Sequence, residues 1–297
     1  MATTNDNGAT TRLPTWLRRP IAQPGQAVSV ARMLEELELN TVCQSAKCPN
    51  RGECFSAGTA TFLIMGDACT RGCRFCAVET RKPGPLDADE PRRVAEAAVR
   101  LGLRHVVVTT VTRDDLRDGG AAHFVAVIDA LRAAMPQTAI EVLTSDFAGH
   151  LDDVDTVAAA RPDVFNHNLE TVPRLYEVVR PGADYLRSLR VLERVCETQP
   201  DLPTKSGIML GLGETPDEVR EVMADLLDHG VRMLTLGQYL RPSKAHLPVA
   251  EYVDPSVFTQ LARDAYKLGF SAVASAPYVR SSYHAAELAN SEGSTEG

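Results

Sequence analysis

Short apolar runs alternate with longer amphipathic segments along the middle of this chain. The runs are continuously apolar, which is typical of parallel strands that are buried on both faces. The predicted strands are 61–65, 104–110, 140–144, 164–169, 205–210 and 233–237, with a weaker one at 271–274. The predicted helices are 90–101, 121–135, 151–161, 184–198, 216–229 and 255–268.

This alternation predicts the fold class. Repeated βα units are typical of an α/β protein with a parallel sheet. Six units fit a partial (β/α)6 TIM-type barrel better than a closed eightfold one, and 297 residues suffice for such a domain. Active-site groups of these barrels gather at the carboxyl ends of the strands. Gly102, Gly230 and Gly269 follow predicted helices, as glycines that end helices commonly do.

Composition and charge narrow the class of protein. Apolar residues make up 44% of the chain, which allows a sizeable core. The net charge of −8 and a pI near 5.4 argue against a general nucleic-acid binder. No apolar run approaches the roughly 20 residues of a membrane span, and residues 1–11 lack the apolar stretch of a signal peptide. We therefore expect a cytoplasmic protein without a membrane or nucleic-acid partner.

The cysteines are grouped rather than scattered. Six of the seven fall in two triplets between Cys43 and Cys76, and the odd total argues against a disulfide framework. The seventh, Cys196, lies in the apolar stripe of a predicted helix. We expect Cys196 to be an inert core residue.

One triplet follows the first predicted strand. Cys69, Cys73 and Cys76 have the spacing C-x3-C-x2-C within CTRGCRFC. Three thiolates can hold three irons of a four-iron cluster, where four cysteines are usual, and so leave one iron open. A structural zinc site would instead be closed by four protein ligands. The spacing therefore favours a cluster with an open iron over a zinc knuckle.

The other triplet lies in a segment rich in turn residues. It has the spacing C-x4-C-x5-C and consists of Cys43, Cys48 and Cys54. One interpretation is a zinc site completed by a distant histidine. The candidate histidines are His105, His123 and His167. A second iron–sulfur cluster is favoured, because the first triplet already implies cluster chemistry.

CTRGCRFC resembles the motif of the radical S-adenosylmethionine (SAM) superfamily, and the two triplets together resemble the lipoyl synthase family. The similarity covers about residues 12 to 289. It runs through TVCQSAKCPNRGECF, GTATFLIMGDACTRGCRFCAV, TRDDLRDGGA, FNHNLETV, SGIMLGLGET, LTLGQYLRPS and RSSYHA. The resemblance implies a sulfurtransferase of lipoate biosynthesis. Such an enzyme inserts sulfur at C6 and C8 of an octanoyl chain on a lysine of a carrier domain.

The resemblance implies two 4Fe-4S clusters with different tasks. The first, on Cys69, Cys73 and Cys76, binds SAM at its open iron and cleaves it to a 5′-deoxyadenosyl radical. An alkyl C–H bond is too strong for acid–base chemistry, so a cofactor-derived radical must remove its hydrogen.

The second, auxiliary cluster is implied to be the sulfur donor. Its ligands would be Cys43, Cys48, Cys54 and a serine of the RSSY motif. Residue matching selects Ser282, whereas chemistry alone does not choose between Ser281 and Ser282. A helix N-cap is the other interpretation of this serine.

Six residues are expected to contact SAM: Gly119, Gly120, Asn168, Glu170, Gly207 and Gly211. The four glycines resemble glycine motifs of the superfamily. The Gly-Gly pair lacks the glutamate that often follows it, and an ordinary turn explains it equally well. Asn168 and Glu170 can hydrogen-bond ribose hydroxyls, and Glu170 can instead pair with a core arginine. We expect the neighbouring His167 to be structural.

Several arginines can contact cofactor carboxylates or the carrier, although surface ion pairs are the simpler expectation. They are Arg180, Arg187 and Arg241. A second group lies closest in sequence to the auxiliary triplet and can attract an acidic carrier domain. It consists of Arg12, Arg18 and Arg19.

The resemblance divides the chain into five segments. They are disordered tails at 1–11 and 290–297, an N-terminal extension with the auxiliary-cluster loop at 12–58, the radical SAM partial barrel at 59–276, and the RSSY segment at 277–289. The implied partners are an octanoylated lipoyl-carrier domain, an electron donor such as a ferredoxin or flavodoxin, and a protein that rebuilds the spent cluster. The rival functions are another sulfur-inserting radical SAM enzyme, such as a methylthiotransferase, and a two-cluster electron carrier.

Overall fold

A computed structural model describes residues 13–18, 24–45, 48, 50, 53–54 and 59–282. The two predicted tails, Arg12, Arg19 and the RSSY segment from Tyr283 onward lie outside these residues. The segment boundaries given above stay predictions.

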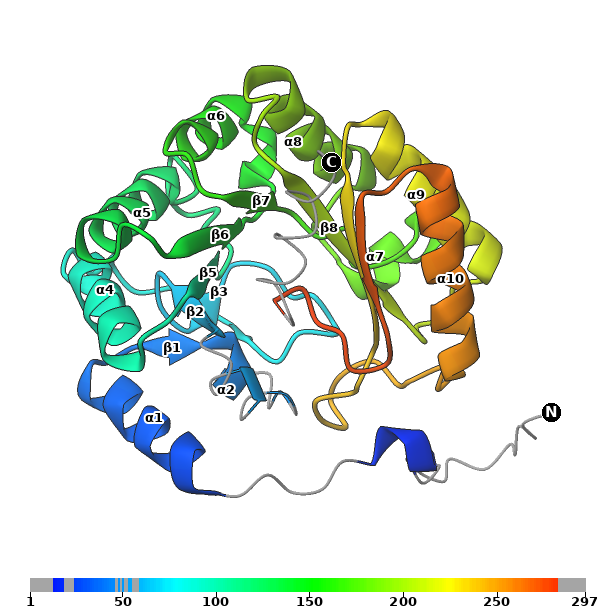
Figure 1. The fold of residues 1–297 in the computed structure, drawn as a ribbon, viewed down its shortest axis with the longest axis horizontal. Coiled ribbons are helices and arrows are strands. Elements are labelled where there is room, and N and C mark those ends of the chain that lie inside the picture. The colour runs from blue at the N-terminus through cyan, green and yellow to red at the C-terminus, as the bar shows by residue number, and fades with distance from the viewer. Residues whose placement is uncertain are drawn as a thin grey trace.

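A curved eight-stranded sheet forms the centre of the fold, with the strand order β1-β2-β5-β6-β7-β8-β9-β10. The seven strands from β2 to β10 are parallel, and β1 is antiparallel to β2. The strands are β1 (Asn40–Thr41), β2 (Thr59–Ile64), β5 (His105–Thr110), β6 (Ala139–Leu143), β7 (Val164–Asn166), β8 (Thr204–Leu210), β9 (Met233–Gln238) and β10 (Ala272–Ser275). Within the described residues β1 and β10 are the edges of this sheet, which confirms the predicted partial barrel (Figure 1).

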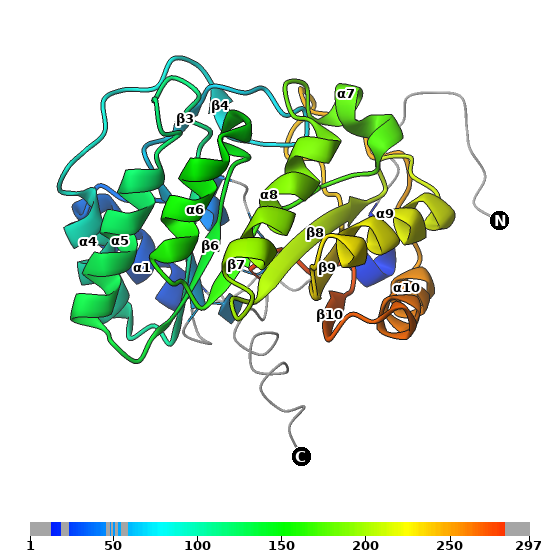
Figure 2. The ribbon, with the colours of Figure 1, turned by 90° about the horizontal axis from the view of Figure 1, so that it is seen from above.

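Helices cover the outer face of the sheet (Figures 1 and 2). Those that follow strands of the barrel are α4 (Glu90–Leu101), α5 (Ala121–Ala134), α6 (Leu151–Ala159), α8 (Tyr185–Thr198), α9 (Pro216–Asp228) and α10 (Pro255–Leu268). The remaining elements are α1 (Pro24–Glu36), α2 (Val42–Ser45), α7 (Tyr176–Val179), three short 3-10 turns and a two-residue parallel pair, β3 (Ala68–Cys69) with β4 (Glu79–Thr80). No described helix is both long enough and apolar enough to cross a bilayer.

The predicted helix ends agree closely with the structure. Gly102, Gly230 and Gly269 have φ of 58°, 84° and 122°, and each lies at the end of a helix. At the start of α9, the Thr215 side chain accepts the N–H of Glu218 while the Glu218 carboxylate accepts the N–H of Thr215. This capping box satisfies amides that the first turn would otherwise leave unpaired.

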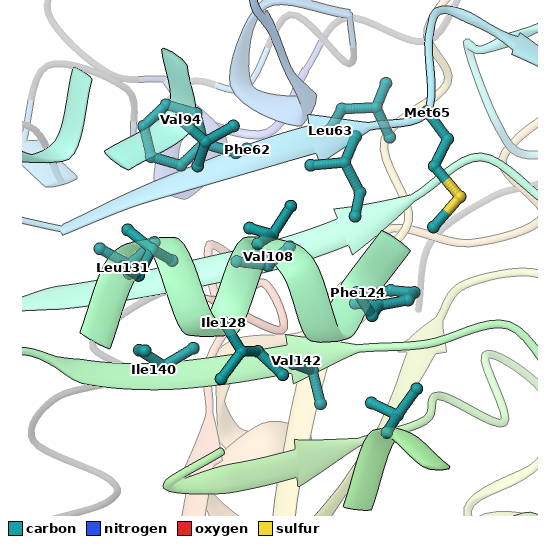
Figure 3. Close-up of a cluster of buried hydrophobic side chains, with 14 of the residues drawn as sticks. Phe62, Leu63, Met65, Val94, Val108, Phe124, Ile128, Leu131, Ile140 and Val142 are labelled. Atoms are coloured by element: carbon teal, nitrogen blue, oxygen red, sulfur yellow. The ribbon is translucent and has the colours of Figure 1, made fainter. Parts of the chain in front are cut away.

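The sheet buries both apolar and polar side chains. On the outer face, Phe124, Ile128 and Leu131 of α5 pack with Val108 and Ile140 of the strands in one apolar cluster (Figure 3). Polar side chains are buried as well, and those that occupy strands include His105, Glu141, Asn166, Lys205 and Thr235. The strands are therefore buried on both faces, as predicted, but are less uniformly apolar than the prediction assumed.

The predicted strand 164–169 is wrong after residue 166. β7 ends at Asn166, and Leu169 donates its N–H to the Ser206 hydroxyl at 3.2 Å instead of a backbone carbonyl. Glu170 then adopts φ 66° and makes only an isolated bridge to Ile208. The sequence prediction also placed no element before residue 59, where α1, β1 and α2 are found.

Candidate functional site

The loop of the first triplet leaves the carboxyl end of β2. Met65 and Gly66, with φ of 67° and 99°, turn the chain, and the β3–β4 pair brings its two ends together. In Figure 2 these short strands lie at the same end of the fold as α7. Arg74 of the loop donates its N–H to Val179 O of α7 at 2.9 Å. The loop therefore lies at the edge where a barrel of this type carries its active site.

Backbone amides point at two sulfurs of this loop. Cys69 Sγ accepts the N–H groups of Arg71 and Thr112 at 3.4 and 3.3 Å, and Cys76 Sγ accepts that of Val78 at 3.5 Å. Such hydrogen bonds stabilise a thiolate and tune a cluster that the thiolate binds.

Two thiols of this loop, those of Cys73 and Cys76, are largely buried. Burial raises the pKa of Cys73, and it raises that of Cys76 to about 12 despite the Val78 N–H. Both groups are thus thiols near neutral pH in the cluster-free protein. Iron must displace their protons, so loading a cluster here releases protons.

Arg71, between the first two cysteines, fastens the loop to the barrel. Its Nε lies 2.7 Å from Asp114 Oδ2 and its Nη2 lies 2.7 Å from Asp146 Oδ1. Asp146 is buried, and burial alone would raise its pKa, but Arg71 and other nearby cations hold it below its usual range. Arg187 also pairs with Asp146, at 3.4 Å, so the ion pair expected for Arg187 is present but its carboxylate is buried and does not lie at the surface.

A cavity of about 340 Å³ opens inside the barrel. Residues from both cysteine triplets and from the C-terminal serines share its wall. Of the predicted site residues, those that line it are Cys43, Cys48, Cys76, Asn168, Glu170, Gly207, Ser281 and Ser282. Most of the remaining wall is apolar, including Val42, Leu143, Ile208, Met209, Leu240 and Val279. Figure 1 shows the loop after β2 and the segment after β10 inside the ring of helices.

Three of the predicted glycines are not among the residues that line this cavity. Gly119 and Gly120 precede α5, and a Cβ at Gly120 would crowd the Met65 side chain. At Gly211 a Cβ would collide with the Gln238 side chain and Glu251 O. These positions thus need glycine for packing, and their predicted SAM contacts stay predictions.

Asn168 and Glu170 meet at the cavity wall. Asn168 Nδ2 donates to Glu170 Oε1 at 2.9 Å and to Ser281 Oγ at 2.5 Å. Burial raises the pKa of Glu170, which nearby Arg180 and Asn168 only partly offset. Asn168 Oδ1 is buried and has no hydrogen-bond partner among the described residues, so it can accept a hydrogen bond from a ligand.

Two arginines differ from expectation. Arg180 does not make the expected surface ion pair: it is half-buried, and its Nη1 donates to Asn168 O and Leu169 O at 2.9 Å. Its Nε is buried, and the part of the chain that the structure describes offers it no hydrogen-bond partner. Arg241 lines the cavity and donates to the carbonyls of Lys244 and His246, which holds its own loop together.

The auxiliary triplet is joined to the other end of the chain. Cys48 donates its N–H to Cys43 O at 3.1 Å, and Cys54 donates its N–H to Asn50 O at 3.0 Å. Asn50 Nδ2 donates to Tyr278 O at 2.6 Å, across 228 positions of sequence. This contact fixes the auxiliary segment beside the segment that carries the two serines.

The two serines have different surroundings. Ser281 is held through its hydroxyl by Asn168 and through its carbonyl by Lys205 Nζ, each at 2.5 Å. Ser282 also lines the cavity, and the described residues include no hydrogen-bond partner for its hydroxyl. Ser282 is therefore the serine better placed to bind a ligand.

The three candidate histidines are held by other contacts. His123 Nε2 lies 2.6 Å from Glu90 Oε2, and His105 Nε2 lies 3.5 Å from Glu141 Oε2. His167 Nδ1 lies 2.9 Å from Thr144 O, and burial lowers the pKa of His167 to about 4. None of the three is among the residues that line the cavity.

Several residues that shape the site were not identified from sequence. Arg71 could have been identified, because it lies between two predicted cluster cysteines and an arginine there can hold the loop through ion pairs. The partners of these residues, Asp146 for Arg71 and Tyr278 for Asn50, are distant in sequence and leave no local pattern.

Comparison with known proteins agrees with this geometry. Residues 63–226, more than half of the chain, match the model of the Radical SAM superfamily. The chain is 57% identical to a lipoyl synthase of Nitrosococcus oceani, over 95% of this chain and 87% of that protein. It is 59% identical to a lipoyl synthase of Caldanaerobacter subterraneus subsp. tengcongensis, over 93% of this chain and 96% of that protein.

Solved structures resemble the fold at low sequence identity. HydG, a maturase of the [FeFe]-hydrogenase, matches 84% of this chain and 66% of its own with a TM-score of 0.57 and 15% identity. Methylornithine synthase (PylB) matches 81% of this chain and 73% of its own with a TM-score of 0.54 and 13% identity. These likenesses support the fold alone.

Proposed function

Because this chain belongs to the lipoyl synthase family of the radical SAM superfamily, we propose that its central cavity is where an octanoyl chain receives sulfur. The chain is an enzyme of that superfamily, and its reaction is the sulfur insertion at C6 and C8 that produces the lipoyl group. A 4Fe-4S cluster and SAM are the cofactors of the superfamily. The ligands, the number of clusters and the partners are part of the proposal.

One observation carries the proposal. The cavity brings Cys76 of the first triplet, Cys43 and Cys48 of the auxiliary triplet, the C-terminal serines and three of the six predicted SAM contacts to a common wall. A sulfur donor and a hydrogen-abstracting group must both reach the same short stretch of alkyl chain. Two cofactor sites that share the wall of one mostly apolar cavity satisfy this requirement.

The residues present fit two clusters. Cys69, Cys73 and Cys76 would hold the first cluster, since amides already point at two of their sulfurs. The auxiliary cluster would be held by Cys43, Cys48, Cys54 and Ser282. When bound, the clusters and SAM supply the electron, the C–H activation and the sulfur.

The protein's own task is to position these groups. We assign Asn168 and Glu170 to SAM, because both residues line the cavity and Asn168 Oδ1 has no hydrogen-bond partner among the described residues. A Cβ at Gly207 would lie 2.6 Å from Thr235 Oγ1 and 2.9 Å from Asn168 Oδ1, so only glycine leaves this wall open. The apolar wall would hold the octanoyl chain and exclude water from it.

The proposed partners follow from this chemistry. An octanoylated carrier domain would present its acyl-lysine at the cavity, and an electron donor such as a ferredoxin or flavodoxin would reduce the first cluster. Because the auxiliary cluster would be consumed, a protein that rebuilds it is needed for repeated turnover.

Anaerobic turnover with an octanoylated carrier peptide, followed by mass spectrometry of the peptide, tests the proposal. We expect two added sulfur atoms, 5′-deoxyadenosine release, and about one lipoyl group per chain because a cluster is consumed. Release of 5′-deoxyadenosine with an unchanged peptide would assign a different target. Electron transfer without SAM cleavage would show a carrier instead of an enzyme.

A further inference from the structure

A lysine is buried in the interior of the barrel, next to the serine segment. Lys205 of β8 has no exposed surface, and its Nζ has three acceptors. Two are the carboxylate oxygens of Glu141 on β6, at 3.0 and 3.1 Å. The third is Ser281 O, at 2.5 Å. An ammonium carries three donors, so every one of them is used.

Such a lysine is costly to bury unless it is paired. Glu141 provides the countercharge and is itself fully buried, with Asn166 Nδ2 donating to its Oε1 at 2.9 Å. This pairing alone would have satisfied the charges and kept the lysine within the sheet. The remaining donor instead reaches a backbone carbonyl 76 residues further along the chain.

The position of the Ser281 carbonyl constrains the position of Ser282. Ser281 C=O and Ser282 N–H belong to one planar peptide unit, so fixing the carbonyl fixes the direction in which Ser282 leaves. Asn168 holds the Ser281 hydroxyl at 2.5 Å, which gives the same residue a second anchor. Ser282 follows directly and lines the cavity.

We propose that Lys205 is a positioning residue, which holds the Ser281 carbonyl so that the Ser282 hydroxyl meets the auxiliary cluster. The inference rests on the proposed function, since it takes Ser282 to be the fourth ligand. Lys205 itself touches neither SAM nor the acyl chain in this role. It transmits the rigidity of β6 and β8 to a segment that follows the last strand.

The test compares two variants of the whole chain. In Lys205→Met/Glu141→Gln the anchor is lost and the two buried charges are removed together, so the fold is kept. Lys205→Met alone would leave a buried unpaired carboxylate. Asn166→Ala is the matched control, because it disturbs the same buried polar group but leaves the contact between Lys205 and Ser281 O.

Hydrogen exchange of the cluster-free proteins gives a readout that does not depend on activity. The Val279 amide, bonded to Ala276 O at 3.0 Å, reports on the segment. We expect exchange in peptides covering 276–282 to be at least about tenfold faster in the double variant, as expected when a local anchor is lost. We expect Asn166→Ala to exchange like the wild type. Equal rates in all three proteins, or equal acceleration in both variants, would overturn the proposal.

The loaded enzyme gives the second readout. In the double variant we expect 5′-deoxyadenosine release to persist, the Mössbauer signature of the serine-bound iron to be lost, and sulfur insertion to fall about 10- to 100-fold, as when the partner of a metal ligand is removed. An unchanged iron signature would overturn the role of Lys205. Failure of the wild-type enzyme to insert sulfur would instead refute the proposed function, and would leave the exchange result standing.

Discussion

The two cysteine segments are attached to the molecule in different ways. The first lies within a strand-to-helix connection of the barrel, and neighbouring barrel elements hold it through the Arg71 ion pairs and the Thr112 amide. The auxiliary segment precedes the barrel, and a contact from Asn50 to Tyr278 joins it to the far end of the chain. One site is therefore built by the barrel, whereas the other requires the two ends of the chain to meet.

This difference suggests a division of labour that mutation can separate. Damage to the loop of the first triplet should stop both radical formation and sulfur insertion, because the second depends on the first. Damage to the auxiliary side should stop sulfur insertion alone.

Removing the first cluster should have the largest effect. Replacing Cys69, Cys73 and Cys76 with alanine should abolish 5′-deoxyadenosine release and leave roughly half of the about eight irons expected for two four-iron clusters. Iron analysis and chromatography of the nucleoside measure the two results. Cys196→Ala is the control and should change neither. Tightly bound zinc in the colourless wild-type protein would contradict the assignment.

Releasing the loop without touching its ligands should have a smaller effect. Arg71→Met removes both ion pairs, and we expect SAM cleavage to fall about 10- to 100-fold, the usual effect of losing a group that orients metal ligands. Arg92→Met, in an exposed ion pair on α4, is the matched control and should retain full activity. Wild-type rates in Arg71→Met would show that the backbone alone holds the loop.

Low pH should reduce the stability of the fold through Glu141, which pairs with Lys205 in the interior of the barrel. Burial alone would raise the pKa of Glu141, but the Lys205 charge, His105 and Asn166 lower it from 4.5 to about 2. The folded state therefore binds this proton less readily, and its stabilisation is present above pH 4.5 and is lost as the pH falls from 4.5 to 2. This pKa shift corresponds to a loss of up to about 3 kcal/mol in the free energy of unfolding.

Denaturant unfolding of the cluster-free protein across this pH range measures the loss. In Glu141→Gln this part of the acid dependence should disappear, together with the stabilisation at neutral pH. Glu218→Gln is the comparison, because its carboxylate also has a pKa near 2 but forms a surface ion pair that water screens. An identical acid slope in Glu141→Gln and the wild type would contradict the prediction.

The smallest effect concerns docking of the carrier. We expect charge reversal of Arg12, Arg18 and Arg19 to weaken binding of an acidic carrier domain and to reduce its salt dependence. Of these, Arg18 is described and exposed, with Nε bound to Leu13 O. Arg190→Glu on α8 is the control and should leave binding unchanged. Titrating the enzyme with the carrier domain at two salt concentrations measures both effects. Unchanged binding in the triple variant would show that the carrier docks on another surface.

The elements that the sequence predicted best carry their own boundary signals. The helices Glu90–Leu101 and Pro255–Leu268 were predicted to the residue, since each begins with a proline in its first turn and ends at a glycine. The strand after α6 was predicted too long, because the Ser206 hydroxyl replaces a ladder partner, and no pattern in 164–169 reveals that.

The candidate site was also predicted only in part. Spacing alone predicted the two cysteine groups, and the cavity includes members of both. What the sequence could not provide are the contacts between distant positions, such as Lys205 with Ser281 O or Arg71 with Asp146. Such pairs form only after the strands have been arranged, and either partner by itself reads as an ordinary polar residue.

The central claim is that radical formation and sulfur donation belong to different cysteine groups. It is tested most directly by measuring 5′-deoxyadenosine and lipoyl product together in the variant Cys43→Ala/Cys48→Ala/Cys54→Ala. We expect this variant to release 5′-deoxyadenosine, since Cys69, Cys73 and Cys76 are intact, and to form no C–S bond. If it still produces the lipoyl group with only the first cluster present, the sulfur comes from elsewhere and the assignment of the auxiliary triplet is wrong.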